Sequence, residues 1–204
     1  LVFSAGDKIS YKKIVSSLGL PFFIKPANLG SSVGINKVKT EKEFKKAVKN
    51  AFQYDTKIVI EEAIDGREIE CSVLGNEKPI ASVPGEVIPN HEFYSYDAKY
   101  IDENGAAFEV PAKLSKKTAD KIRAMAVKAF RVLACEGMGR VDFFLKKNGN
   151  IIVNEINTIP GFTAISMYPK LWEASEIPYS KLLDILIDLA IRRFKTHQKI
   201  KTSI

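Results

Sequence analysis

Residues 140–157 read RVDFFLKKNGNIIVNEIN, and Asn148-Gly149 separates two apolar runs within them. An Asn-Gly pair in this setting predicts a β-hairpin with a two-residue type I′ turn, because both central residues of that turn take positive φ. The residues on either side of the turn should then form two antiparallel strands.

The turn fixes which residues face each other across the predicted hairpin. Paired positions sum to 297, so Arg140 faces Asn157 and Asp142 faces Glu155. Since side chains two apart share a face, these polar groups are expected together on one side of the ribbon. Apolar contacts are expected from Val141, Phe143, Val153 and Ile156.

Two carboxylates that face each other destabilise a sheet, so Asp142 and Glu155 need a positive partner. One solution is a hard divalent cation such as Mg²⁺, which takes oxygen ligands from carboxylates and completes its shell with water and phosphate. The other is a solvated polar face on which Arg140 neutralises the acids. The Pro160-Gly161 loop that follows the hairpin favours the first, because it exposes backbone amides that suit anion binding.

The chain has 204 residues, 46% of them hydrophobic, which is enough for one domain or two small ones. No uninterrupted apolar run approaches the roughly 18 residues that a membrane helix needs, so a soluble protein is expected. Cys71 and Cys135 lack the spacing of a metal site, which favours a reduced, cytoplasmic protein. The chain begins with Leu1 instead of Met and could be a fragment.

The net charge of +7 is concentrated at one end of the chain. Residues 192–204 contain five Lys or Arg residues and no acid. Such a run is typical of a solvated terminus, and it lacks the aromatic interleaving that base stacking needs. We therefore expect neither a nucleic-acid partner nor a membrane partner.

The order of the predicted elements is typical of an α+β protein. Residues 1–20 give weak signals, apart from a turn at Gly6-Asp7. Thr40-Glu41-Lys42-Glu43 is a capping box that predicts the start of a helix. The expected strands are residues 22–25, 35–39, 57–64, 67–74 and 79–83, and the expected helices are residues 40–52, 115–134, 167–174 and 180–194.

Residues 30–34, Gly-Ser-Ser-Val-Gly, suit a phosphate-binding loop. Glycine lets backbone amides approach an anion closely, and the two hydroxyls add donors. The loop is not a P-loop, because the Gly-Lys-Ser/Thr ending is absent. Lys25 lies on the strand before it and could reach the same phosphates. The alternative is an ordinary mobile turn beside an exposed lysine.

Residues 86–110 form a long segment without clear periodicity. Long ordered loops are commonly functional lids, and the aromatic residues of 93–100 argue against a disordered insertion. A lid loop is therefore expected over about residues 86–110.

At five places, in the same order, the sequence resembles the D-alanine–D-alanine ligases of the ATP-grasp superfamily. The matching stretches are residues 23–35, Glu61-Glu62, residues 94–100, residues 139–142 and residues 154–161. The resemblance implies an ATP-grasp fold, in which two α+β subdomains with mostly antiparallel sheets grip ATP. Residues 1–62 would be the central subdomain, and residues 63–204 would be the carboxy-terminal subdomain with a metal-binding hairpin. The family's amino-terminal domain would be missing.

The resemblance also assigns the residues that bind ATP. Phosphate contacts would come from Lys25, Ser31, Ser32, Val33 and Lys99. Adenine would be held by Glu61 and the backbone around Ile64, and the ribose by Glu68. The expected nucleotide-binding set is completed by Phe144 and by Glu62, where the family often has a lysine.

Metal, catalytic and substrate residues follow from the same resemblance. Mg²⁺ would bind Asp142, Glu155 and Asn157, with two ions expected and Mn²⁺ as a substitute. In the absence of nucleotide, Arg140 is the expected partner of the acids. The catalytic set would be Arg140, Ser31, Gly161 and Tyr100, which would latch the long loop over the site. The second substrate would be bound by Ser166, together with Gly161 and Arg140.

The implied reaction joins two D-alanine molecules for peptidoglycan precursor synthesis. ATP would phosphorylate the first carboxylate, and the second amine would attack the acylphosphate. Such a reaction needs positioning and electrostatic stabilisation more than a protein nucleophile. Tyr100 favours an amine acceptor, because relatives that make D-alanyl-D-lactate have a histidine near this position.

The full-length protein is the expected ligase and an expected homodimer, and this chain alone should be inactive. Two alternatives stay open. One is another ATP-grasp ligase that joins a different carboxylate and amine, and the other is a non-catalytic nucleotide-binding or basic interaction module.

Overall fold

The computed structural model describes residues 1–30, 32–89, 106–163 and 165–201. The chain divides into two compact units, the first built mainly from Leu1–Asp65 and the second from Gly66–Ile88 and the chain after Phe108. Each unit has its own sheet and its own core. Both sheets are mostly antiparallel and have helices packed on them, which confirms the α+β class.

The sheet of the first unit has the strand order β1-β4-β2-β3. Its strands are β1 (Val2–Ser4), β2 (Phe22–Pro26), β3 (Asn36–Val38) and β4 (Lys57–Glu62), and its helices are α1 (Tyr11–Leu18) and α2 (Glu41–Ala51). Alternate residues of β2 and β4 point into the core, where Phe22, Ile24, Ile58 and Ile60 are fully buried. The opposite face of these two strands is left for other contacts.

Local sequence signals explain α2 but not α1 or β1. Thr40 Oγ1 accepts a hydrogen bond from Glu43 N at 3.3 Å, and Glu43 Oε2 accepts one from Thr40 N at 3.1 Å, which confirms the capping box. Neither α1 nor β1 was predicted. The three residues of β1 are ordered by pairing with β4, in which Val2 faces Val59, and this contact is invisible to a local pattern.

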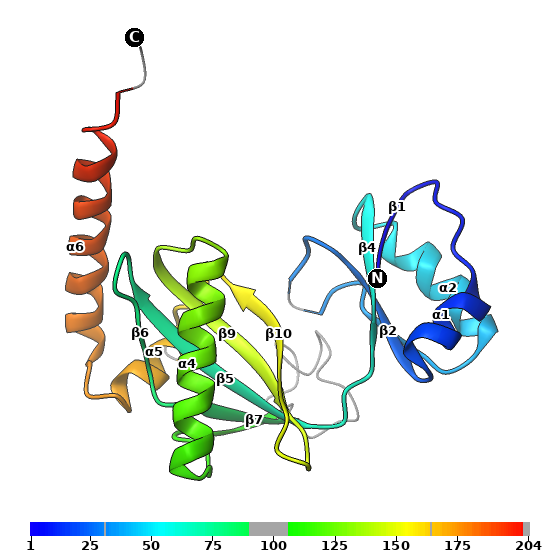
Figure 1. Ribbon diagram of the computed structural model, residues 1–204, viewed down its shortest axis with the longest axis horizontal. Coiled ribbons are helices and arrows are strands. Elements are labelled where there is room, and N and C mark those ends of the chain that lie inside the picture. Colours follow the sequence, from blue (N-terminus) through cyan, green and yellow to red (C-terminus); the bar gives the residue numbers. More distant parts are fainter. Residues whose placement is uncertain (31, 90–105, 164, 202–204) are drawn as a thin grey trace. The chain divides into compact units, whose positions relative to one another are not determined.

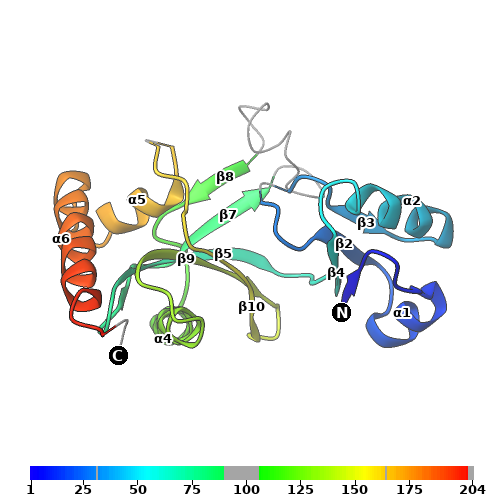
Figure 2. The same cartoon turned by 90° about the horizontal axis from the view of Figure 1, so that it is seen from above.

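The sheet of the second unit has the order β10-β9-β5-β7-β8, with β6 paired to β5 (Figures 1 and 2). Its strands are β5 (Arg67–Gly75), β6 (Ile80–Ala81), β7 (Gly85–Pro89), β8 (Ala106–Glu109), β9 (Gly137–Leu145) and β10 (Ile151–Asn157). The prediction of a loop over residues 86–110 is therefore wrong at both ends, because β7 and β8 occupy them. Residues 90–105 lie outside the described part of the chain.

The two faces of this sheet have different coverings. Helix α4 (Lys116–Val132) packs its Ile122 and Phe130 on one face, against Ile69, Val141 and Phe143 (Figure 1). Helices α5 (Met167–Glu173) and α6 (Tyr179–His197) pack on the other face, where Leu74 meets Trp172 and Leu182. Figure 2 shows α4 and α5 on opposite sides of the sheet.

Helices α5 and α6 cover their face of the sheet at one end of β5 and β9, where Leu74 pairs with Met138. Along the same face the next pairs are Ser72 with Arg140 and Glu70 with Asp142. The face thus changes from apolar to polar within one pleat, and its polar part carries the side chains predicted for the site.

The β9–β10 hairpin has the predicted pairs but not the predicted turn. Arg140 pairs with Asn157 and Asp142 with Glu155, which is confirmed. The two-residue type I′ turn is wrong. Lys146 N donates to Asn150 O at 2.9 Å, so the loop between them has three residues, and of these only Gly149 has positive φ, at 81°.

A bulge at Asn154 reconciles this longer turn with the predicted pairs, because the register shifts between Val153 and Glu155. Without the bulge, Asn154 would face buried Phe143 and Val153 would lie on the polar face. With the bulge, Val153 faces Phe143 instead. Val153 stays 42% exposed, because β10 is at the edge of the sheet, so its expected apolar contact is only partial.

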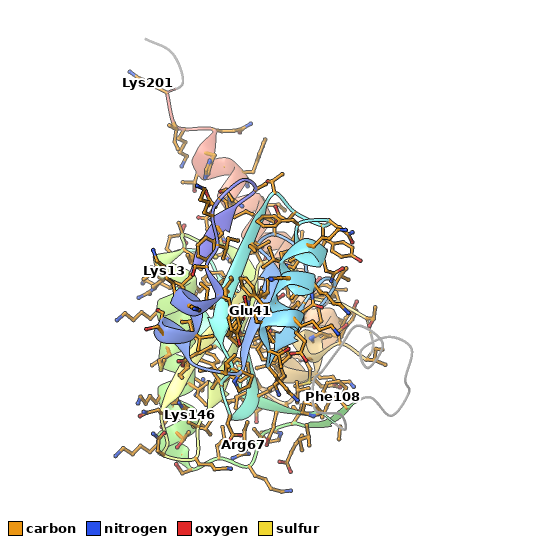
Figure 3. All side chains as sticks on the ribbon, turned by 90° about the vertical axis from the view of Figure 1, so that its right-hand side faces the viewer. Lys13, Glu41, Arg67, Phe108, Lys146 and Lys201 are labelled. Atoms are coloured by element: carbon orange, nitrogen blue, oxygen red, sulfur yellow. The ribbon has the colours of Figure 1, made fainter. Side chains whose placement is uncertain are left out.

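The basic end of the chain follows α6. Figure 3 shows Lys201 beyond the end of this helix. Arg193 of α6 pairs with Glu136, with Nε 2.6 Å from Oε2, whereas residues 194–201 are exposed. Within the described residues, the helices are too short or too polar to span a bilayer. Both cysteines are free thiols, and burial raises the pKa of Cys71 to about 12.

Candidate active site

On the first unit, Lys25 and Glu61 lie together on the sheet face that is turned away from the core. Lys25 pairs with Val59 and Phe23 with Glu61, so the two charged residues are diagonal neighbours on β2 and β4. Lys25 Nζ lies 2.7 Å from Glu61 Oε1. Strand alternation places Glu62 on the opposite face. The structure therefore brings Lys25 and Glu61 together but separates Glu62 from them.

Asp55 holds the base of the loop that follows β2. Its Oδ2 accepts hydrogen bonds from Asn28 N at 2.8 Å and from Asn28 Nδ2 at 3.0 Å, and its Oδ1 accepts one from Lys57 N at 3.1 Å. The bond from the Asn28 backbone, followed by that from Lys57, lowers the pKa of Asp55. The entry to the predicted phosphate loop is thus fixed by a carboxylate.

The far end of this loop requires glycine. Gly34 has φ of 72°, and a Cβ at this position would lie 2.7 Å from Cδ2 of Tyr54. Val33 N donates to Gly30 O at 3.3 Å, so this amide is engaged within the loop. Ser31 lies outside the described residues, and its phosphate role stays a prediction.

On the second unit, three carboxylates lie across three neighbouring strands. Glu70 of β5 pairs with Asp142 of β9, and Asp142 pairs with Glu155 of β10. Glu68 pairs with Phe144 one step further along the same face. The sheet therefore brings together the predicted metal ligands and two of the predicted nucleotide contacts, Glu68 and Phe144.

Arg140 lies among these acids. Its Nε is 2.7 Å from Asp142 Oδ1 and its Nη2 is 2.8 Å from Asp142 Oδ2. Nε is also 3.1 Å from Glu70 Oε2. Burial alone would lower the pKa of Arg140, but the charge and hydrogen bond of Asp142 and the charges of Glu70 and Glu155 raise it. Arg140 is therefore the positive partner of the acids on this face.

Glu70 was not among the predicted site residues. Glu68 and Glu70 are two apart on a strand of alternating charged and apolar residues, Arg67-Glu68-Ile69-Glu70, so they share a face. This alternation was a usable signal. What it could not show is that β9, with Arg140, is the neighbouring strand.

The donor set on this face fits a hard divalent cation. Asp142, Glu155 and the amide oxygen of Asn157 are oxygen ligands of the kind Mg²⁺ takes, and three carboxylates face one guanidinium. Asp142 Oδ2 also accepts a hydrogen bond from Asn157 Nδ2 at 3.0 Å. The described residues contain no group of three or more His, Cys, Asp or Glu side chains arranged to hold a metal ion. Metal binding would require Asn157 to present its oxygen and Arg140 to release Asp142.

The loop after β10 places two predicted substrate residues side by side. Ser166 Oγ accepts a hydrogen bond from Thr163 N at 3.0 Å, and this turn brings Ser166 back over Gly161. A Cβ at Gly161 would lie 2.9 Å from Ser166 Oγ. The ring of Phe162 packs on those of Tyr168 and Tyr179, with centroids 5.7 Å and 5.5 Å apart. The loop is thereby anchored to α5 and α6.

Other predicted residues are not brought into these groups. Ile64 is half-buried in the connection between β4 and β5. Lys99 and Tyr100 lie outside the described residues, so their roles stay predictions. A separate hollow of about 530 Å³ lies between α6 and the start of β9, lined by Leu186, Arg193 and other residues that do not belong to the predicted site.

Comparisons with known proteins agree with this geometry. The family described as D-ala D-ala ligase C-terminus matches residues 3–188. A D-alanine–D-alanine ligase of Oceanobacillus iheyensis is 57% identical over 197 residues, which are 97% of this chain and 54% of that protein. D-alanine–D-alanine ligase A of Escherichia coli is 52% identical over 196 residues, 96% of this chain and 54% of that protein.

Solved structures are similar in fold. The D-alanine-D-alanine ligase from Coxiella burnetii has a TM-score of 0.86 and 46% identity, covering 97% of this chain and 53% of its own. The VanG D-Ala:D-Ser ligase from Enterococcus faecalis has a TM-score of 0.83 and 36% identity, covering 93% of this chain and 55% of its own. These similarities confirm the ATP-grasp fold. The chain spans about half the length of the curated relatives it matches. The match over residues 3–188, together with this fold, shows that the chain belongs to the D-alanine–D-alanine ligase family and corresponds to the carboxy-terminal part of its members.

Proposed function

We propose that the full-length protein is an ATP-dependent D-alanine–D-alanine ligase. The observation that carries the proposal is the polar sheet face on which Arg140 contacts Asp142 and Asp142 faces Glu155. It occurs in a chain that is more than half identical to named D-alanine–D-alanine ligases along nearly its whole length. This chain supplies groups for the nucleotide phosphates, a divalent cation and the second substrate.

The reaction has two balanced steps. In the first, a carboxylate oxygen of one D-alanine takes the γ-phosphoryl group of ATP, and ADP leaves. In the second, the amine of another D-alanine attacks the carbonyl carbon of this acylphosphate. Inorganic phosphate leaves with the carbon–oxygen bond electrons, and the new amide nitrogen loses a proton. Positioning and charge stabilisation are the main needs of both steps.

The residues of this chain divide these tasks. Lys25 exchanges Glu61 for the α and β phosphates of ATP. Asp142, Glu155 and the Asn157 oxygen would hold Mg²⁺, which would supply positive charge to neutralise the transferred phosphoryl group. Arg140 stabilises the negative charge that develops during transfer and attack. The Gly161 amide assists, and Ser166 Oγ donates to the carboxylate of the second D-alanine.

Several finer expectations remain part of the proposal. Glu61 and the Ile64 backbone hold adenine, Glu68 holds the ribose, and Ser32 and Val33 close over the phosphates. Two Mg²⁺ ions are expected, with Mn²⁺ as a substitute. A cytoplasmic homodimer is expected, and the two free thiols are consistent with a reducing compartment.

The test uses the full-length protein and measures phosphate release from ATP with D-alanine and Mg²⁺. We expect Asp142→Asn and Glu155→Gln each to lower kcat by at least about 100-fold, because each removes a charge that binds the cation. Asp120→Asn is the matched control, since Asp120 lies on α4, which covers the opposite face. Near-normal turnover of both site variants would contradict the proposal. Full turnover by residues 1–204 alone would contradict the need for the longer chain.

A second candidate is a ligase that accepts D-serine as the second substrate. The observation in its favour is the similarity to the solved D-Ala:D-Ser ligase, at 36% identity. Mass spectrometry of the products formed from an equal mixture of D-alanine and D-serine separates the two candidates. D-alanyl-D-alanine as the main product supports the first, and D-alanyl-D-serine supports the second.

A further inference from the structure

Arg140 has two carboxylate partners, and only one of them belongs to the proposed metal site. We propose that Glu70 is a positioning residue that keeps the Arg140 guanidinium in place when Asp142 binds a divalent cation. The inference rests on the proposed function, because it takes Asp142 as a metal ligand. It goes beyond that function in making metal binding depend on Arg140 exchanging Asp142 for Glu70 as its partner.

The contact geometry shows how Arg140 is shared. Its Nε lies 2.7 Å from Asp142 Oδ1, to which it donates a hydrogen bond, and 3.1 Å from Glu70 Oε2, with which it forms an ion pair without a hydrogen bond. Its Nη2 lies 2.8 Å from Asp142 Oδ2. The guanidinium can therefore shift toward Glu70 with little movement. The contact with Asp142 is the shorter of the two.

The sheet holds Glu70 in a fixed position. β5 pairs with β9 on one side and with β7 on the other, and Glu70 faces both Asp142 and Gly85 in these pairings. The side chains of Glu70 and Arg140 are 13% and 19% exposed. A strand paired on both sides varies little in position, so the backbone of Glu70 is held beside Asp142.

Metal binding removes a partner from Arg140. Both oxygens of Asp142 already accept hydrogen bonds from Arg140, and Oδ2 also accepts one from Asn157. A cation on Oδ2, which already accepts two of these bonds, would displace at least one donor, and a cation on Oδ1 would repel the guanidinium bound there. A largely buried guanidinium without a partner is unfavourable, because it has lost its hydration. Glu70 supplies the partner, and the guanidinium stays beside the place where the phosphoryl group reacts.

The same arrangement predicts a competition. Without Glu70, Arg140 would remain fully paired with Asp142 and would oppose cation binding. Removing Arg140 should have the opposite effect, because a competing positive charge is gone. Direct ligation of the metal by Glu70 would differ from both, because its loss would weaken metal binding whether or not Arg140 is present.

A double-mutant cycle in the full-length protein tests the inference. Mn²⁺ binding is measured by electron paramagnetic resonance without nucleotide, for Glu70→Gln, Arg140→Met and the double variant. We expect Glu70→Gln to weaken Mn²⁺ binding about tenfold and Arg140→Met to tighten it. In the Arg140→Met background, Glu70→Gln should change Mn²⁺ binding by less than about threefold. The remaining change comes only from the lost negative charge of Glu70 near the metal site. Asp120→Asn, on the helix that covers the other face, should change it by less than about twofold.

Turnover gives the second readout. Glu70→Gln should lower kcat by at least about tenfold and leave KM for ATP within about threefold, because it acts through Arg140 in the reacting state. In the Arg140→Met background it should cause no further loss. Equal effects of Glu70→Gln in both backgrounds, on Mn²⁺ binding or on kcat, would overturn the inference. The Mn²⁺ measurement decides it even if D-alanine is not the substrate, so its failure is distinguishable from failure of the proposed function.

Discussion

Arg67 neutralises a buried carboxylate with a two-pronged ion pair. Its Nε and Nη2 lie 2.7 Å and 2.5 Å from the two oxygens of Glu86, which is only 7% exposed. The hydrogen bond that Glu86 accepts from Arg67 raises the pKa of Arg67 despite partial burial. Arg67→Met should lower the free energy of unfolding by about 1–3 kcal/mol, because the carboxylate of Glu86 would stay buried without its positive partner.

Urea unfolding measures this change. Arg131→Met, at an exposed position of α4, is the control and should cost less than about 0.5 kcal/mol. Adding Glu86→Met to Arg67→Met should restore part of the loss. A double variant no more stable than Arg67→Met alone would contradict this explanation.

Asp55 should make the first unit sensitive to acid. Its pKa is lowered in the folded protein, first by the hydrogen bond from the Asn28 backbone and then by that from Lys57. The stabilisation is therefore complete above the ordinary carboxyl pKa of about 3.9 and is lost as pH falls through the lowered value. Asp55→Asn should lower Tm at pH 6, and the difference from the unchanged protein should shrink toward pH 2.

Thermal unfolding across this pH range checks the expectation. Asp184→Asn, on the exposed face of α6, is the matched control and should show no such convergence. A Tm difference for Asp55→Asn that stays constant down to pH 2 would rule out the loop carboxylate as the cause.

The β9–β10 hairpin combines an extra turn residue with an extra strand residue. Deleting Asn154 should remove the bulge and keep Asp142 opposite Glu155, with Val153 still opposite Phe143. The free energy of unfolding should change by less than about 1 kcal/mol. Deleting Ile156 instead should cost more than about 2 kcal/mol, because it removes a core contact and moves Asn157 to the other face.

Urea unfolding of the two deletion variants makes the comparison. The metal-binding pairs should survive only in the first, and Mn²⁺ binding reports them. Equal stability of the two variants would show that the register is not set by the core face.

The sequence predicted the hairpin pairs because they depend on alternation within one local stretch. It did not predict the turn or the bulge. The bulge keeps the polar Asn154 from facing Phe143, and Phe143 packs on α4, which lies outside the hairpin stretch. The strand β7 was missed for a similar reason. Glu86 interrupts its apolar pattern and is accommodated only by Arg67, whose position a local pattern does not show.

At the scale of the whole molecule, two separate cores should respond separately to mutation. Ile60 lies in the core of the first unit and Ile69 in that of the second, and both are fully buried. Truncation to alanine typically costs about 2–5 kcal/mol. Ile60→Ala should speed amide exchange in β2 and β4 by roughly 30-fold or more and change β5 and β9 by less than about threefold.

Hydrogen–deuterium exchange measured by mass spectrometry resolves the two units. Ile69→Ala is the matched variant and should give the reverse pattern. Faster exchange throughout the described residues after either change would show that the two units unfold as one.

The sequence predicted most of the individual elements and brought most site residues to the correct strands. It could not predict which strands neighbour each other, and this adjacency decides the contacts of Glu70 and Lys25. Both depend on pairings between distant segments, Glu70 with Asp142 and Phe23 with Glu61. Such pairings are chosen by the packing of each whole core.

Both cations that the proposed chemistry assigns to phosphate already have an internal anion. Lys25 contacts Glu61, and Arg140 contacts Asp142. These positions should therefore attract few counterions from solution. ATP replaces bound carboxylates instead of dissolved salt, so its affinity should depend on ionic strength less steeply than two exposed cations would suggest.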